Sequence, residues 1–149
     1  MQTIEIEKYK EDAQSDLIAL LRLNTPYYFA YEEEADFIKY LEGEREDYYV
    51  IKQQQNIIGC GGINYSPDKK IAILSWDMLH PDYHGKGIGK QLFDFRLAHI
   101  TSQHISQIIV RTSQLAYTFY QRQGFVITET IEDYWATGLD LVKMELQLR

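Results

Sequence analysis

Three glycines alternate with other residues in the segment His84–Lys90 (HGKGIGK). The segment follows a strand-like pattern and precedes an amphipathic helical pattern, so it should form the start of a helix. The first backbone N–H groups of a helix have no partner within the helix and carry a partial positive charge. Glycines let an anion approach those groups closely, and Lys86 and Lys90 add charge at the rim. The segment therefore indicates a phosphate-binding site.

Two common nucleotide motifs do not fit this spacing. A P-loop requires GxxxxGK[ST], but Lys90 is followed by Gln91. A Rossmann fingerprint requires GxGxxG, whereas the glycines fall at positions 85, 87 and 89, with Leu92 and Phe93 beyond them. Two interpretations remain open on the segment alone: an anion site of another kind, or a glycine-rich turn that simply begins a helix.

A wider stretch resembles the donor-site motif of the GNAT superfamily of N-acetyltransferases. An apolar strand end at Leu79 and a proline at Pro81 precede His84–Gly89, which matches the family pattern Gln/Arg-x-x-Gly-x-Gly/Ala except at His84. Residues 113–125 (SQLAYTFYQRQGF) are similar to the family's second signature, A-x-x-[FL]-Y-x-x-x-G-F. The resemblance is specific over residues 77–125 and follows the element order along nearly the whole chain.

The resemblance implies acetyl-CoA as the acyl donor. It assigns backbone atoms of residues 77–79 to the pantetheine and thioester, residues 85–90 to the pyrophosphate, and Ser113 to the pantetheine. The acetyl-CoA-binding residues that it implies are Asp77, Met78, Leu79, His84, Gly85, Lys86, Gly87, Ile88, Gly89, Lys90, Ser113 and Tyr120.

Acetyl transfer to an amine requires one proton to reach the leaving sulfur and one to leave the amine. Tyr120 resembles the family's general acid, and the alternative is a buried tyrosine whose hydroxyl bonds a carbonyl. Asp77 is the only carboxylate of the strand expected at Lys70–Leu79, where alternation puts it on the same face as Ile73 and Ser75. The base is therefore either Asp77 or water relayed through backbone carbonyls.

Aromatic residues with acidic neighbours are the candidates for the acceptor side. They are Tyr27, Tyr28, Phe29 and Tyr31, which precede Glu32–Glu34, and Tyr134 and Trp135 near the C-terminus. In the resembling fold both segments line the acceptor pocket, and rings beside carboxylates suit a cationic amine. Alternatively, the acids favour a helix N-terminus and the rings pack. We expect the acceptor to be a small-molecule primary amine or a peptide N-terminus.

Hydrophobic periodicity predicts elements in the order βααβββαβαββ. The expected strands are Thr3–Tyr9, Asp47–Gln53, Ile57–Tyr65, Lys70–Leu79, Gln107–Thr112, Gly124–Thr130 and Leu141–Leu148. The expected helices are Asp12–Asn24, Glu32–Leu41, a helix that His80–Lys90 opens and that runs to about Ser102, and Leu115–Arg122. In the third of these, Ile88, Leu92, Phe95 and His99 share one stripe and Gly89, Phe93 and Leu97 another. This order predicts an α/β (α+β) fold of one domain, residues 1–149. The GNAT resemblance adds that the central, mostly antiparallel sheet is splayed between its fourth and fifth strands and flanked by helices.

Composition limits the function further. The net charge is −7, with 22 acidic against 15 basic residues and no basic stripe, which argues against a nucleic-acid partner. Cys60 is the single cysteine, and the four histidines follow no metal-site spacing, so no metal is expected. No apolar run approaches ~20 residues and no signal-peptide pattern is visible, so we expect no membrane partner and a cytoplasmic location. A homodimer is left open.

Two rival functions fit the same fold. One is a non-catalytic acyl-CoA-binding or regulatory module, which the departure at His84 and the lack of an acid in Ile71–Ser75 and Ile108–Val110, where some members of the resembling family carry a Glu, would favour. The other is a transferase for a different acyl group.

Overall fold

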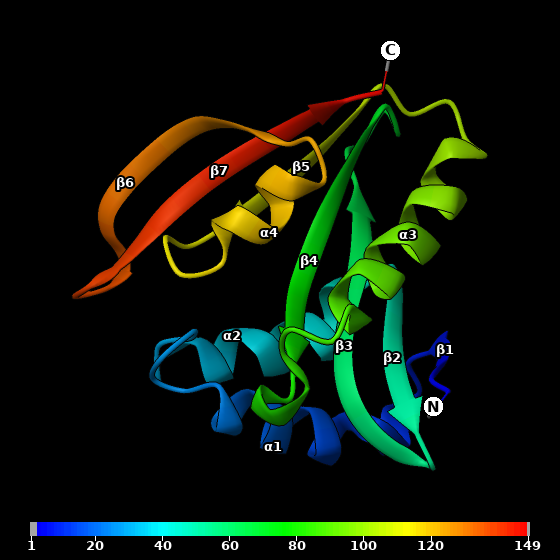
Figure 1. Cartoon of the computed structure of the whole chain (residues 1–149), viewed down its shortest axis with the longest axis vertical. Coiled ribbons are helices and arrows are strands. Elements are labelled where there is room, and N and C mark those ends of the chain that lie inside the picture. Colours follow the sequence, from blue (N-terminus) through cyan, green and yellow to red (C-terminus); the bar gives the residue numbers. More distant parts are fainter. Residues whose placement is uncertain (1–2, 149) are drawn as a thin grey trace.

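The computed structural model describes residues 3–148, and a seven-stranded sheet forms its centre (Figure 1). The sheet order is β1-β2-β3-β4-β5-β7-β6. The strands are β1 (Glu5–Lys8), β2 (Asp47–Gln53), β3 (Asn56–Tyr65), β4 (Ile71–Leu79), β5 (Gln107–Thr112), β6 (Val126–Ala136) and β7 (Leu139–Gln147). The α-helices are α1 (Gln14–Leu23), α2 (Glu33–Lys39), α3 (Ile88–Thr101) and α4 (Tyr117–Arg122). Only β4 and β5 pair in parallel among these strands, so the predicted fold class and element order are confirmed.

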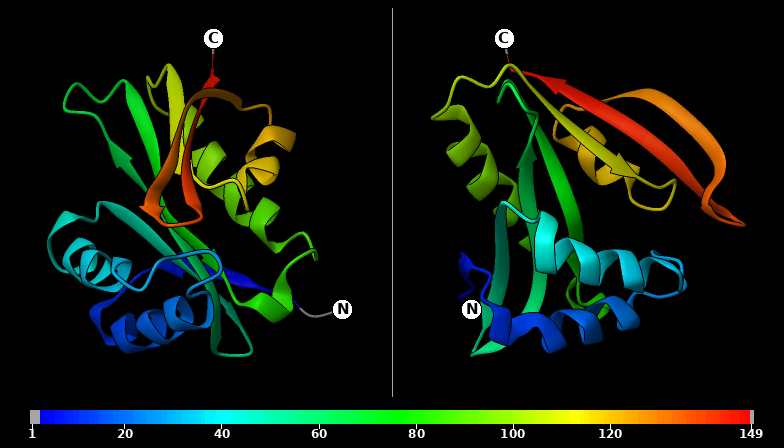
Figure 2. Two further views of the ribbon diagram at one scale, coloured as in Figure 1. Left: turned by 90° about the vertical axis from the view of Figure 1, so that its left-hand side faces the viewer. Right: turned by 180° about the vertical axis from the view of Figure 1, so that it is seen from behind.

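Helices cover both faces of the sheet, and each face has its own apolar core (Figure 2). On one face, Leu17 of α1 and Phe37 of α2 are fully buried against β2 and β3. On the other, Leu92 of α3 packs with Ile108 and Val110 of β5. Ile108 and Val110, which are two positions apart on β5, thus face the same core, as the pleat of a strand requires. We call these the α1–α2 face and the α3 face.

The pairing of β4 with β5 covers only part of the two strands. It runs from Ile71 opposite Gln107 to Leu74 opposite Val110, although β4 continues to Leu79. Figure 1 shows the halves of the sheet diverging from this shared end. The sheet is thus splayed between its fourth and fifth strands, as expected. Backbone groups on the facing edges beyond Leu74 are left without a partner strand.

A bulge at Trp76 reverses the alternation along β4. Trp76 has a φ of 52°, and the register with β3 shifts between Cys60 and Gly62. Ser75 points to the α1–α2 face, but Asp77 points to the α3 face. The predicted shared face of Asp77, Ile73 and Ser75 is therefore wrong, because simple alternation does not survive an inserted residue.

Gly61 of β3 provides space for the Asp77 side chain that the bulge redirects. A Cβ at Gly61 would lie 2.5 Å from Asp77 Oδ1 and 3.2 Å from Arg96 Nη1. A Cβ contact of 2.5 Å is not tolerated, so the missing side chain allows the Asp77 carboxylate to reach α3.

The buried face of α3 takes residues from both expected stripes. The buried positions are Ile88, Leu92, Phe93, Arg96 and Ile100. Phe95 is 42% exposed and His99 is also exposed, so these two members of the first stripe face away from the core. The buried face also places an arginine among apolar residues.

Two elements differ clearly from their predicted boundaries. The last hairpin is longer than predicted, because β6 continues to Ala136 and β7 begins at Leu139. The second helix ends its α-helical part at Lys39 and continues as a π-helical turn, Tyr40–Glu44. Across residues 3–148, no helix has both the length and the apolar character needed to cross a bilayer.

Candidate functional site

A cavity of about 910 Å³ opens where β4 and β5 separate. One part, here called the donor half, is lined by the start of α3, by α4 and by the end of β4. The other, the acceptor half, is lined by the α1–α2 connection, the Trp76 bulge, Arg111 of β5 and Trp135 of β6. Tyr120 and Asp77 also line this cavity.

The glycine segment borders the donor half with open backbone. Gly85 and Gly87 have φ values of 76° and 78°, and a Cβ at either would meet nothing within 4 Å. Gly87 is the N-cap of α3 without a side-chain cap, and the N–H of Gln91 donates to its carbonyl at 3.2 Å. The N–H groups before Gln91 lack helical partners. A helix start that is uncapped and open in this way fits an anionic phosphate.

Gly89 serves a different purpose from the other two glycines. A Cβ there would lie 3.3 Å from the ring of Phe119. Because Gly89 has no side chain, α3 can pack closely against α4. The role of Gly89 is therefore to bring the two helices together beside the cavity.

His84 joins the donor half to the acceptor half. Its Nε2 donates to the carbonyl oxygen of Leu79 at 3.2 Å, and its Nδ1 lies 3.5 Å from the hydroxyl of Tyr28. Because a carbonyl only accepts, Nε2 is the donor in its bond to Leu79, and Nδ1 faces the Tyr28 hydroxyl. The imidazole thus fixes the strand end to the glycine segment.

The two lysines are less available than the sequence suggested. Lys90 lines the cavity but pairs with Asp94 at 2.7 Å. Lys86 is absent from the lining, and its Nζ lies 5.5 Å from the centre of the Tyr83 ring. The backbone, rather than lysine charge, dominates this end of the cavity.

The remaining predicted donor residues lie along the cavity as well. Met78, Leu79, Ile88 and Ser113 all line it. The Ser113 hydroxyl accepts the N–H of Leu115 at 3.3 Å and is buried, so its side chain first of all shapes the turn before α4.

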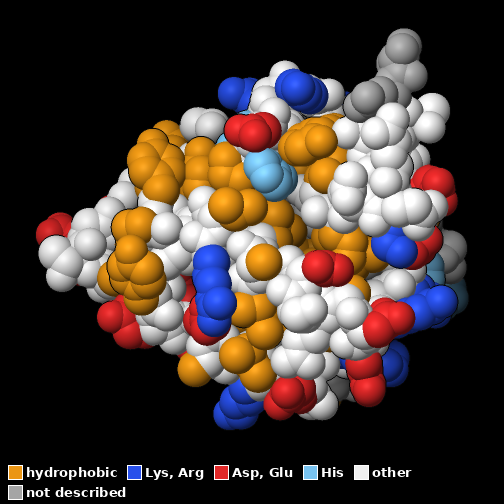
Figure 3. All heavy atoms as spheres, turned by 90° about the horizontal axis from the view of Figure 1, so that it is seen from below, with side chains coloured by type: hydrophobic (Ala, Val, Ile, Leu, Met, Phe, Trp, Pro, Cys, Tyr) orange, Lys and Arg blue, Asp and Glu red, His pale blue; other side chains and the backbone are white. Residues whose placement is uncertain are grey.

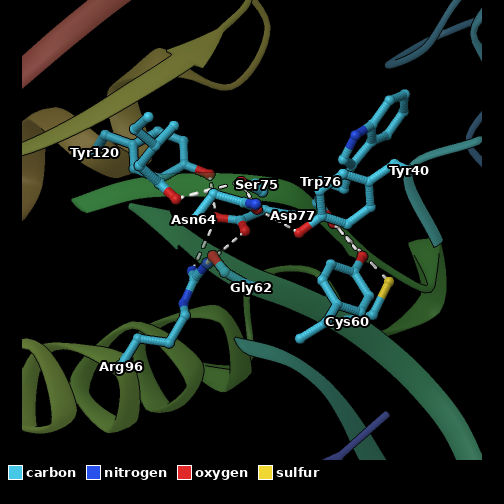
Figure 4. Close-up of polar contacts among 11 residues, drawn as sticks. Tyr40, Cys60, Gly62, Asn64, Ser75, Trp76, Asp77, Arg96 and Tyr120 are labelled. Atoms are coloured by element: carbon cyan, nitrogen blue, oxygen red, sulfur yellow. Dashed lines mark hydrogen bonds and ion pairs between the residues drawn. The ribbon is translucent and has the colours of Figure 1, made fainter. Parts of the chain in front are cut away.

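A buried charged network lies beneath the opening of the strands (Figure 4). Arg96 donates from Nη1 to Asp77 Oδ1 at 2.6 Å and from Nη2 to Oδ2 at 2.9 Å. Arg96 Nη1 also donates to the Gly62 carbonyl at 3.0 Å. The Tyr120 hydroxyl donates to Asp77 Oδ2 at 2.6 Å. Both carboxylate oxygens are therefore occupied by donors.

Burial and charge together control the acidity of Tyr120. Its side chain is 5% exposed, and burial raises its pKa well above the usual value, with the adjacent Asp77 carboxylate acting in the same direction. Arg96 opposes this shift. Tyr120 is consequently protonated at any ordinary pH, with its proton directed at Asp77.

A second polar cluster lies at the bulge, on the α1–α2 face. The hydroxyls of Tyr40 and Ser75 donate to Asn64 Oδ1 at 2.6 Å and 2.9 Å. The Tyr48 hydroxyl donates to the Trp76 carbonyl at 2.7 Å. The oxygens of Tyr40 and Ser75 keep lone pairs that can accept a hydrogen bond from a bound amine.

The aromatic residues predicted for the acceptor side divide into two groups. Tyr28, Phe29 and Trp135 line the large cavity. Tyr27 and Tyr31, which are 62% and 70% exposed, line a second cavity of about 530 Å³ that also touches Trp135. Figure 3 views the molecule from below and shows hydrophobic side chains gathered on that face, with scattered charged ones between them.

Tyr134 contacts neither cavity but packs beside Trp135. Their ring centres are 4.9 Å apart, and Tyr134 accepts a hydrogen bond from Arg111. Tyr134 and Trp135 therefore have different environments, although both were predicted to line the acceptor side.

The three glutamates of the acidic run, Glu32–Glu34, lie in different environments. Glu34 accepts two hydrogen bonds from Arg22, at 2.8 and 2.9 Å. Glu33 is buried and accepts the Ala30 N–H at 2.8 Å, and burial raises its pKa. Glu33 lines the large cavity and Glu32 the second one. Of the two interpretations left open, binding of a cation is therefore disfavoured for Glu34, whose carboxylate is paired on the surface, and is compatible with the position of Glu33.

Two residues of the cavity region, Arg96 and Arg111, were missed by sequence reasoning. Arg96 had a usable signal, because it follows Ile88 and Leu92 at a spacing of four and Asp77 was the one carboxylate of the preceding strand. Arg111 had none beyond its alternation with buried Val110. Its neighbours come from a hairpin more than twenty residues away.

Comparison with known proteins agrees with this architecture. Residues 12–148 match the model of the acetyltransferase (GNAT) domain. A curated relative, an amino-acid acetyltransferase of Actinobacillus pleuropneumoniae serotype 3 (strain JL03), is 28% identical over 119 residues, covering 77% of this chain and 26% of the relative. This chain thus spans about a quarter of the length of that relative.

Solved structures resemble the whole fold. The ribosomal-protein-S18-alanine N-acetyltransferase from Escherichia coli aligns with a TM-score of 0.81 at 16% identity, over 98% of this chain and 94% of that one. An aminoglycoside 6'-N-acetyltransferase complexed with coenzyme A aligns with a TM-score of 0.79 at 14% identity, over 97% of both chains. These likenesses concern the fold alone, whereas the domain match covers nearly the full sequence. The chain therefore belongs to the GNAT acetyltransferase family.

Proposed function

We propose that this protein transfers the acetyl group of acetyl-CoA to a primary amine by direct attack. The observation that carries the proposal is a single cavity that contains an open, uncapped helix start at one end and a buried, protonated tyrosine beside the splayed strands. In the overall reaction a nitrogen–carbon bond forms, a carbon–sulfur bond breaks, one proton reaches the sulfur and one leaves the nitrogen.

The donor half has the features that a phosphate-bearing thioester requires. Backbone N–H groups of residues 85–90 would hold the pyrophosphate, with Gly85 and Gly87 leaving room for it. The edge of β4 beyond Leu74 lacks a partner strand, so residues 77–79 would bond the pantetheine arm through their backbone. The acetyl-CoA supplies an activated acyl group at the end of that arm.

Tyr120 is proposed as the general acid for the sulfur. A tyrosine with an ordinary pKa near ~10 is mismatched with a thiol near ~8.5 by ~2 kcal/mol, and burial increases that mismatch. The proton must also leave its hydrogen bond with Asp77. Tyr120 would therefore donate late, as negative charge accumulates on sulfur and competes with the carboxylate. The Asp77–Arg96 pair holds the hydroxyl in position for this.

The amine must lose its proton by another route. A free alkylamine is neutral in roughly one molecule in 2,500 at pH 7, a cost of ~4.6 kcal/mol. Asp77 faces Arg96 and Tyr120 with both oxygens, so we assign it a positioning role and propose water as the proton acceptor. The Tyr40 and Ser75 hydroxyls at the bulge would hold that water and orient the amine.

A coupled assay tests the proposal. Purified protein with acetyl-CoA is offered amines of several classes, namely polyamines, aminoglycosides, amino acids, amino-acid amides and short peptides. Release of free CoA and the mass of the acetylated product are both measured. An amine whose mass increases by that of one added acetyl group supports the proposal. Acetyl-CoA binding without product from any amine would instead identify a binding module, and turnover of only other acyl-CoA thioesters would change the acyl group.

A further inference from the structure

Arg111 lies in the acceptor half of the cavity, and no residue from 3 to 148 supplies a counter-ion to it. It follows Val110, which is buried on the α3 face, so its side chain points to the α1–α2 face. On that face it lies one step beyond the last paired residues of β4 and β5, and Ser75 occupies the corresponding step on β4. The two residues thus stand on opposite sides of the opening between the strands.

The guanidinium is held in place by the last hairpin. Its Nη2 donates to the Tyr134 hydroxyl at 2.7 Å, and its central carbon lies 5.2 Å from the Tyr134 ring centre and 5.8 Å from that of Trp135. Trp135 is itself fixed by a hydrogen bond from its indole N–H to the Thr112 carbonyl at 3.1 Å. Such stacking orients the planar group and leaves most of its five N–H donors free.

The charges around Arg111 do not neutralise it. Among the described residues, 3–148, no carboxylate forms an ion pair with Arg111. The residue opposite it on β7 is Lys143, another cation, whose nearest acidic partner is Glu145 at 3.9 Å. Glu129 of β6 lies opposite Lys143 rather than Arg111. Since none of these groups supplies a carboxylate to it, the oriented guanidinium is suited to bind an anion, and a planar carboxylate matches its fork best.

The acceptor half also contains a negative group. The buried carboxylate of Glu33 lines it, and the oxygens of Tyr40 and Ser75 accept hydrogen bonds at the bulge. A purely anionic ligand would be repelled by the acceptor oxygens of Glu33, Tyr40 and Ser75. A purely cationic ligand would be repelled by the guanidinium of Arg111. A molecule with an ammonium at one end and a carboxylate at the other satisfies both.

We infer that the acceptor is a small amine that carries a carboxylate, of the amino-acid class, and that Arg111 binds that carboxylate. This inference rests on the proposed acetyl transfer and names the substrate of the same site. It predicts that the enzyme distinguishes an amino acid from its uncharged amide, because only the acid pairs with the guanidinium.

The test compares the common L-amino acids with their α-carboxamides as acceptors, with acetyl-CoA as donor. For at least one amino acid, kcat/KM should exceed that of its own α-amide by about 10–100-fold, the range of a charge-assisted hydrogen-bonded pair. Arg111→Gln should reduce this ratio to near one through a higher KM for the acid, with the amide and acetyl-CoA little affected. Arg111→Lys should recover part of the ratio, since it keeps the charge and loses the fork.

Two further measurements show which carboxylate is bound and whether the effect is specific to Arg111. For acidic amino acids, the side-chain amide is compared with the α-amide, which identifies the carboxylate that is bound. Lys143→Gln is the matched control, because it removes a positive charge opposite Arg111 but outside the cavity lining, and it should preserve the ratio.

Other outcomes would overturn the inference. Equal turnover of acids and amides by the wild type, or a preference for acids that persists in Arg111→Gln, removes Arg111 as the carboxylate site. Acetylation of polyamines or peptides without any amino acid leaves the acetyl transfer standing and rejects the amino-acid class. Absence of acetyl transfer to every amine rejects both.

Discussion

The guanidinium of Arg96 meets the carboxylate of Asp77 through two parallel hydrogen bonds, Nη1–Oδ1 at 2.6 Å and Nη2–Oδ2 at 2.9 Å. Arg96 is 1% exposed and comes from α3, whereas Asp77 reaches it from β4 only because of the Trp76 bulge. Tyr120 completes the group from α4. The pair therefore links three elements that surround the opening between the strands.

Breaking this pair should destabilise the protein strongly. Asp77→Asn leaves a buried arginine without its counter-charge, so we expect a loss of about 3–5 kcal/mol in the free energy of unfolding. The double variant Asp77→Asn, Arg96→Met should recover a large part, since no uncompensated charge remains. Urea denaturation of the singles and the double measures the coupling. Small and additive losses would show that water reaches the pair and screens it.

Acetyl-CoA should stabilise the folded protein. At about 100 times its Kd a ligand adds ~2.7 kcal/mol, which for a chain of this size raises Tm by about 5–10 °C. Thermal melts with increasing acetyl-CoA and CoA measure the shift. If neither compound moves Tm at saturating concentration, the donor half does not bind acetyl-CoA.

Gly87 should be needed for acetyl-CoA affinity. Gly87→Ala places a methyl group at the open helix start, and we expect Kd to rise by about tenfold or more, with a strain cost of ~1–2 kcal/mol from its positive φ. Gly138 is the matched control, because it has a φ of 82°, equally open surroundings and a position in the β6–β7 turn. Gly138→Ala should cost similar stability and leave Kd for acetyl-CoA unchanged. Equal effects of both variants on Kd would assign the loss to strain.

Tyr120→Phe should lower kcat while acetyl-CoA affinity stays within a few-fold. The change removes the proton and its bond to Asp77 but keeps the ring in the core, so we expect about a 10²-fold loss where chemistry limits the rate. Single-turnover kinetics with calorimetric Kd values separate the two effects. Full turnover by the variant would make Tyr120 a structural residue.

Alkaline pH should destabilise the fold through its buried tyrosines. Burial raises the pKa of Tyr48 and of Tyr120 well above the value near ~10 of an unfolded chain. Below pH ~10 both states keep these protons, so the two tyrosines contribute no pH dependence there. Above pH ~10 the unfolded state ionises first, and the free energy of unfolding falls by up to ~1.4 kcal/mol per pH unit for each group.

Chemical denaturation between pH 8 and about 11.5 measures this slope. Tyr48→Phe should reduce it by one group, whereas the control Tyr31→Phe changes a 70% exposed side chain and should not. Cys60, whose pKa burial raises to about 12, adds to the same loss at alkaline pH. A slope that is identical in all three proteins would contradict the assignment.

The sequence by itself determined the element order and the donor end of the cavity. Both depend on local patterns: alternation along strands, four-residue spacing along helices, and the glycines at 85 and 87, whose open backbone belongs to one short segment. Any helix start has unpaired N–H groups, because each helical bond joins an N–H to the carbonyl four residues earlier, so no distant segment is needed to create them.

Only the tertiary structure decided which side chains pair with one another around the cavity. The Trp76 bulge turned Asp77 toward Arg96, which alternation could not foresee because an inserted residue reverses every later side chain. The acidic run could have bound a cation or favoured a helix N-terminus, and it is the approach of Arg22 in space that pairs Glu34. Arg111 gained its orientation from Tyr134, 23 positions later in the chain. Pairings of this kind depend on how distant segments approach in space, and short-range sequence patterns carry no record of that.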